Sequence, residues 1–154
     1  MRTNNTTIVS IFRGVIILLI NLVAWWAIPV GIASPDILVM CGILLGFFIV
    51  SPSLLAVFLF TEVVLMNFSP FFSLEWLYVI GAGMAVFVIM RLFIFKRTVF
   101  VVGILAALAE VLFWIMFGGI SSLASVMFIE VLLYSILWSG IVYTLLIWLE
   151  KKYL

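Results

Sequence analysis

Residues 37–66 read ILVMCGILLGFFIVSPSLLAVFLFTEVVLM, an apolar run that Ser51-Pro52-Ser53 interrupts. A single helix over this stretch would be about 45 Å long at about 1.5 Å per residue, which is too long for one crossing of a hydrocarbon core of about 30 Å. A proline flanked by serines is a turn signal. The sequence therefore predicts two short helices, at about 36–50 and 53–67, joined by a tight turn at Pro52.

Four further apolar stretches flank this pair, at about 12–30, 74–95, 98–117 and 122–149. The chain is 69% hydrophobic and only 8% charged, whereas soluble domains carry roughly a quarter of charged residues. We therefore expect an all-α integral membrane protein. It would form one transmembrane domain over residues 1–154, a compact bundle of six short helices.

The basic residues test this count. With six spans, all seven of them fall on one side of the membrane: Arg2, Arg13, Arg91, Lys96, Arg97, Lys151 and Lys152. The connections on the other side carry Asp36 and Glu75. Merging the two helices of residues 37–66 would separate the N-terminus from the other bases. Since Lys and Arg are enriched in cytoplasmic loops, we expect both termini to be cytoplasmic.

Three glutamates, Glu62, Glu110 and Glu130, lie within these apolar segments of a chain that has no histidine. A carboxylate within the bilayer is costly and usually faces a cavity, the protein interior or a partner. At about 1.5 Å per residue the three carboxyls lie about 15, 18 and 12 Å from the points where their segments enter the membrane, which brings Glu130 to a level similar to that of Glu110. They could form a proton or cation site, contact a partner chain, or make interhelical hydrogen bonds. We expect interhelical or partner-binding roles.

Small residues recur at helical spacing in two segments. Gly103 and Ala107 share a face with Glu110, and Gly81 and Ala85 lie four residues apart. Small residues let membrane helices approach closely. We expect the fourth and fifth helices to pack against each other through these faces, with Gly103 and Ala107 as interhelical or partner-binding candidates.

The residues needed for most catalysis are missing. Without histidine, Ser/His and Cys/His nucleophile pairs cannot form. The single cysteine, Cys41, excludes an intramolecular disulfide and a cysteine metal cluster. The bases fall in three separate patches and do not form a nucleic-acid surface. We expect no enzymatic activity, no cofactor, no metal and no nucleic-acid partner.

The order of these features resembles the MreD family, the rod-shape-determining membrane proteins of bacteria. The resemblance covers roughly residues 34–115. Its features are, in order, Ser34-Pro35-Asp36-Ile37-Leu38-Val39 at the start of the second span, Glu62 late in the third, the loop from Asn67 to Ser73, the glycine-containing span from Tyr78 to Arg91, the basic break at Lys96-Arg97, and Glu110 in the fifth span.

The resemblance implies a bundle similar to the substrate-binding S-component of energy-coupling-factor transporters, with turns at Pro35, Asp36 and Pro52. It also implies a non-enzymatic scaffold of the bacterial inner membrane that serves cell shape and peptidoglycan synthesis. Its partners would be an MreC-like single-span protein, the cell-wall elongation synthase and transpeptidase, and an MreB-type filament.

The alternative is the substrate-binding subunit of a small-molecule (vitamin) transporter. That family carries an Ala-x-x-x-Ala pattern on its first span, where residues 14–21 here read GVIILLIN. A transporter subunit would also need a polar pocket that opens outward. We therefore favour the scaffold.

Overall fold

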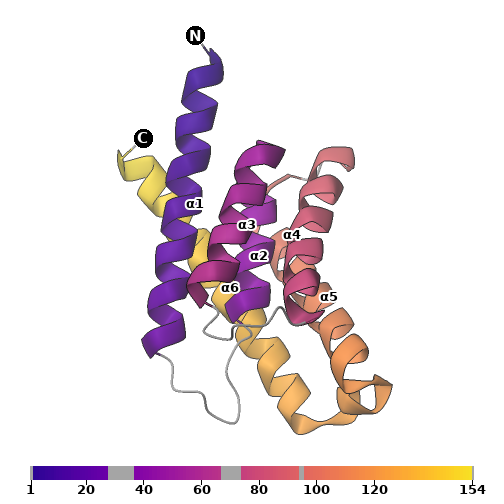
Figure 1. The fold of residues 1–154 in the computed structure, drawn as a ribbon. Helices are drawn as coiled ribbons and strands as arrows, with labels where there is room; N and C mark the ends of the chain where they lie inside the picture. The colour runs from indigo at the N-terminus through magenta and orange to yellow at the C-terminus, as the bar shows by residue number, and fades with distance from the viewer. Residues whose placement is uncertain (1, 28–36, 67–73, 94–95, 154) are drawn as a thin grey trace.

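The computed structural model describes residues 2–27, 37–66, 74–93 and 96–153 of the chain. Helices account for nearly all of this part, and no strand occurs in it (Figure 1). The elements are α1 (Arg2–Ala27), α2 (Ile37–Phe48), α3 (Pro52–Met66), α4 (Leu74–Leu92), α5 (Val99–Gly118), the 3₁₀ helix η1 (Ile120–Ala124) and α6 (Val126–Tyr153). The expectation of an all-helical chain with a break at Pro52 is confirmed.

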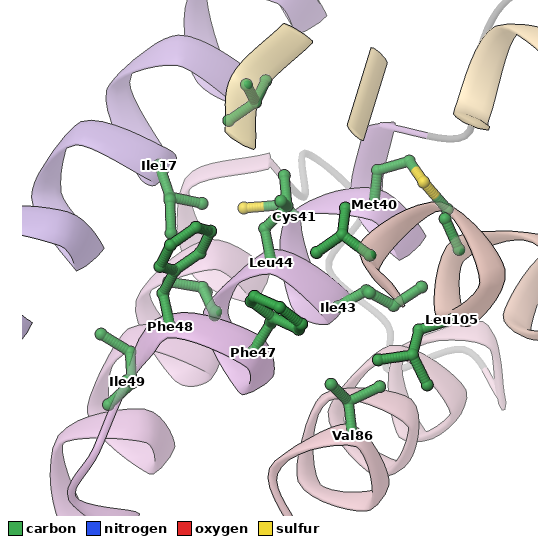
Figure 2. Packing of buried hydrophobic residues seen from close by; sticks show 14 of the residues in the cluster. Ile17, Met40, Cys41, Ile43, Leu44, Phe47, Phe48, Ile49, Val86 and Leu105 are labelled. Carbon is green, nitrogen blue, oxygen red and sulfur yellow. The ribbon is translucent and has the colours of Figure 1, made fainter. Parts of the chain in front are cut away.

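Helix α2 is the centre of the bundle. All but one of its residues are buried, and it contacts α1, α3, α4, α5 and α6. A helix that is hydrophobic all round is buried on every side, and α2 lacks any polar face. Figure 2 shows the surrounding side chains that meet α2, among them Ile17 of α1, Val86 of α4 and Leu105 of α5.

Glycines let α2 and α4 touch through their backbones. A Cβ atom placed on Gly46 would lie 2.2 Å from the carbonyl oxygen of Gly83, and one placed on Gly83 would lie 2.9 Å from the carbonyl oxygen of Gly42. Gly42 and Gly46 form a G-x-x-x-G pattern, which in apolar helices marks a face of close approach. This pair was not among the predicted contact residues, although the pattern is visible in the sequence.

Helix length separates two classes of helix. Within the described residues, four stretches are long and apolar enough to cross a membrane, namely Thr6–Trp25, Leu74–Leu92, Val99–Gly118 and Val126–Tyr153. Helices α2 and α3 have 12 and 15 residues, so they are about 18 and 22 Å long. By length, then, the expectation of membrane-spanning helices is supported for α1, α4, α5 and α6 only.

Several helix ends differ from the predicted spans. Helix α1 begins at Arg2 rather than near residue 12, because a helix can continue through polar residues beyond the hydrophobic stretch. Helix α5 begins after Thr98, whose side chain accepts a hydrogen bond from the Val101 N–H. Between α5 and α6, Gly119 adopts a positive φ of 76° and η1 follows. The turn residues Pro35 and Asp36 lie outside the described residues.

The prediction that the fourth and fifth helices pack through their small-residue faces is wrong. Helix α4 packs mainly on α2 and α5 mainly on α6, whereas α4 and α5 meet at few points. A Cβ atom on Gly81 would meet nothing within 4 Å, while one on Gly103 would lie 3.6 Å from Ile136 of α6. The reason is that α4 packs closely on α2 at Gly46, and the spacing of small residues along one helix does not reveal such a long-range contact.

Candidate functional site

Glu62 and Glu110 are completely buried between helices. The Ser135 hydroxyl of α6 donates a hydrogen bond of 2.7 Å to Glu110 Oε1 on α5. The Glu62 carboxyl of α3 lies close to the Cys41 thiol of α2. Both carboxyls therefore lie between helices inside the bundle, and neither is accessible to a partner from the surface. Among the described residues, no three acidic, cysteine or histidine side chains group so that they could hold a metal ion.

Glu130 lies in a different environment, exposed on the surface of α6. We expected it at the depth of Glu110, which is wrong, because η1 delays the start of α6 to Val126. Ser135 occupies that depth instead, and Glu130 lies only about 6 Å from the helix start. The stretch from Glu130 to Glu150 is about 30 Å long, the thickness of a hydrocarbon core. The two carboxylates are thus separated along α6 by about the length of one membrane crossing.

Other polar side chains also connect helices. Trp138 Nε1 of α6 donates a 2.9 Å hydrogen bond to Oδ1 of Asn21, which is buried on α1. The Tyr78 hydroxyl of α4 donates a 2.6 Å hydrogen bond to the Ala109 carbonyl of α5. Such bonds each contribute about 1 kcal/mol in membrane proteins. These groups orient the helices relative to one another rather than line a polar cavity.

The basic residues gather at one end of the bundle, which we call the basic end and define by Arg13, Arg91, Lys96, Arg97, Lys151 and Lys152. Arg13 pairs with Glu150, the Arg91 guanidinium donates to the Val50 carbonyl, and the Tyr143 hydroxyl donates a 2.7 Å hydrogen bond to the Arg97 carbonyl. Both chain ends point to this side (Figure 1). The structure therefore brings together bases that are far apart in sequence.

Positive charge is in excess at the basic end. Of the acidic residues that the structure describes, Glu150 lies there, and Arg13 already pairs with it. Partial desolvation, followed by the charges of Arg13 and Arg91, lowers the pKa of Arg97. An anionic group would therefore be favoured near Arg97, because it would relieve this repulsion.

Two apolar grooves run along α5. The α5–α6 groove has a volume of about 920 Å³ and is lined by Val99, Phe100, Gly103, Ile104, Ala107, Ile136, Leu137, Gly140, Ile141, Thr144, Leu145 and Trp148. The α4–α5 groove, on the other side, has a volume of about 750 Å³. It is lined by Leu74, Leu77, Tyr78, Gly81, Ala82, Ala85, Val86, Ile89, Leu105, Leu108, Ala109, Val111, Leu112, Met116 and Phe117.

The predicted site residues are thus distributed over three places. Glu62 and Glu110 lie inside the bundle, Glu130 lies on its surface, and Gly103 and Ala107 line the α5–α6 groove. Ser135 was not among the predicted residues. It lies in a different helix from Glu110, and no local sequence pattern indicates their contact. Comparison of the chain with protein-family models, with curated proteins and with solved structures finds no match.

Proposed function

We propose that this protein is a non-enzymatic membrane scaffold that holds the transmembrane helix of a partner protein in the α4–α5 groove. The observation that carries this proposal is the stripe of small residues, Gly81, Ala82 and Ala85, along one wall of the groove. Small residues let a second helix approach the backbone closely, which is how membrane helices associate without a hydrophobic driving force.

The dimensions of the groove suit a helix. Its α4 wall extends from Leu74 to Ile89, about 22 Å at 1.5 Å per residue. Apart from its own helix, a Cβ atom on Gly81 would meet nothing within 4 Å in the part of the chain that the structure describes, so no described side chain from another helix fills the position. The hydrogen bond from the Tyr78 hydroxyl of α4 to the Ala109 carbonyl of α5 joins the two walls of the groove. The groove therefore offers an apolar surface with its polar groups already satisfied.

The resemblance to the MreD family supplies the biological setting of the proposal. An MreC-like single-span protein is the occupant of the α4–α5 groove. The cell-wall elongation synthase, its transpeptidase and an MreB-type filament are the wider partners, in the bacterial inner membrane with both termini cytoplasmic. The apolar lining of both grooves favours helices and lipids over a polar vitamin, so it supports the scaffold rather than the transporter subunit.

A matched pair of substitutions tests the docking surface. Ala85→Leu fills the α4–α5 groove, whereas Ala56→Leu adds the same bulk at an exposed position of α3 outside either groove. The tagged full-length chain is purified from its native membrane in mild detergent and its co-purifying proteins are identified. We expect a single-span protein and cell-wall synthesis enzymes with the unaltered chain and with Ala56→Leu, and their loss with Ala85→Leu.

Two outcomes would contradict the proposal. Recovery of a transport ATPase module in place of cell-wall proteins would support the transporter subunit. Equal recovery of the single-span protein with both variants would show that a partner binds elsewhere than the α4–α5 groove.

A further inference from the structure

The α5–α6 groove opens at the basic end of the bundle. It includes Val99 and Phe100 in the first turn of α5 and Trp148 near the end of α6. From there it extends to Ala107 on one wall and Ile136 on the other. These walls are about 12 and 18 Å long, close to the ~15 Å that is half of a hydrocarbon core. The groove therefore has the length of an acyl chain in one leaflet.

Two cations flank the mouth of this groove. The hydrogen bond from the Tyr143 hydroxyl to the Arg97 backbone carbonyl, 2.7 Å long, holds the backbone of Arg97 against α6, two residues before Val99, which lines the groove. On the other side, Lys152 Nζ lies 5.0 Å from the centre of the Trp148 ring, which itself lines the groove. Both side chains are exposed. An anion at the mouth can therefore reach two positive charges.

Among the described residues, positive charge exceeds negative charge around this mouth. Glu150 is engaged by Arg13, and Lys96 and Lys151 add exposed charge nearby. The mouth also lies at the start of α5, and the positive end of a helix dipole favours phosphate groups. An apolar groove of one-leaflet length that ends between two bases is complementary to one kind of membrane component.

We propose that the α5–α6 groove binds an anionic phospholipid of the leaflet at the basic end. One acyl chain lies along Gly103, Ala107 and Gly140, and the phosphate lies between Arg97 and Lys152. A zwitterionic lipid fits the groove equally well, but the bases repel its ammonium group about as much as they attract its phosphate. The site is separate from the α4–α5 groove, so lipid and partner helix bind to different faces of α5.

Native mass spectrometry of the full-length chain in mild detergent tests this assignment, with phosphatidylglycerol and phosphatidylcholine of identical acyl chains as probes. We expect preferential retention of phosphatidylglycerol. Each base near a membrane surface contributes about a fivefold change in affinity for anionic lipid. Replacing both Arg97 and Lys152 by Gln should therefore lower phosphatidylglycerol retention by about twenty-five-fold and leave phosphatidylcholine unchanged.

The double variant Lys96→Gln/Lys151→Gln is the matched control, because it removes the same charge from residues that do not flank the mouth. It should lower retention much less. Ala107→Leu fills the groove and should weaken both lipids, whereas Ala85→Leu in the α4–α5 groove should weaken neither. This last variant separates failure of lipid binding from failure of partner binding.

Two results would overturn the assignment. One is equal retention of the two lipids by the unaltered chain. The other is an equal effect of the two charge-removing variants, which would indicate a diffuse attraction to anionic membranes rather than a site.

Discussion

Gly46→Ala should disrupt the contact between α2 and α4. The added Cβ would lie 2.2 Å from the Gly83 carbonyl oxygen, whereas a carbon and an oxygen in contact lie about 3.3 Å apart. The two backbones must therefore separate by roughly 1 Å. Overpacking of this kind costs about 1–3 kcal/mol, and the upper end applies because backbone atoms cannot rotate away. Because alanine has a higher helix propensity than glycine, it offsets about 1 kcal/mol of this cost. The net loss in the free energy of unfolding is therefore about 2 kcal/mol.

Gly81→Ala is the control, because its Cβ meets nothing within 4 Å. It should gain about 0.5–1 kcal/mol from helix propensity alone. The same chemical change thus has opposite signs at two glycines, a difference of about 3 kcal/mol, or more than a hundredfold in the unfolding equilibrium. Unfolding of the purified protein in mixed detergent and dodecyl sulfate, followed by near-ultraviolet circular dichroism, measures it. Equal stability of the two variants would refute the close α2–α4 contact.

Three further changes probe the polar groups. Glu110→Ala removes the acceptor of the buried Ser135 hydroxyl and should lower stability by about 1–3 kcal/mol in the same unfolding assay. Glu110→Gln keeps an acceptor and should lower stability by less than about 1 kcal/mol. Equal losses of stability in the two variants would argue against the hydrogen bond. A double-mutant cycle with Arg13→Gln and Glu150→Gln should give a coupling energy of about 1 kcal/mol, because the pair is only partly exposed, with 16% and 20% side-chain exposure. No coupling would mean that the ion pair does not join α1 to α6. Glu130→Gln should change stability by less than about 0.5 kcal/mol, because the side chain is exposed, and a loss comparable to that of Glu110→Ala would place Glu130 in the interior.

The membrane class and the helix boundaries at Pro52 and Thr98 could be read from the chain, because both are local properties. Hydrophobic length predicts which segments can cross a bilayer, and a proline with flanking serines predicts a turn. The alternation of basic and base-free connections likewise predicted a single basic end, where the structure finds Arg91 and Arg97. Each inference depended on residues close together in sequence.

Which of the three glutamates are buried could not be predicted in this way. Glu62, Glu110 and Glu130 all lie among apolar neighbours, yet two are fully buried and one is exposed. The difference depends on how far each helix is rotated about its axis and where it begins. For Glu130 the start of α6 is set by η1, a turn whose length the apolar pattern does not reveal.

Composition and hydrophobic length were thus enough to predict an all-helical chain that has helices long and apolar enough to cross a membrane and its bases at one end. Which helices become neighbours was decided only in three dimensions. Helix α2 occupies the centre because no face of it is polar. Helix α4 packs mainly on α2, where Gly46 and Gly83 are in close contact, and it has few contacts with α5. The α4–α5 groove is the consequence, since close packing on one face of a helix leaves another face open.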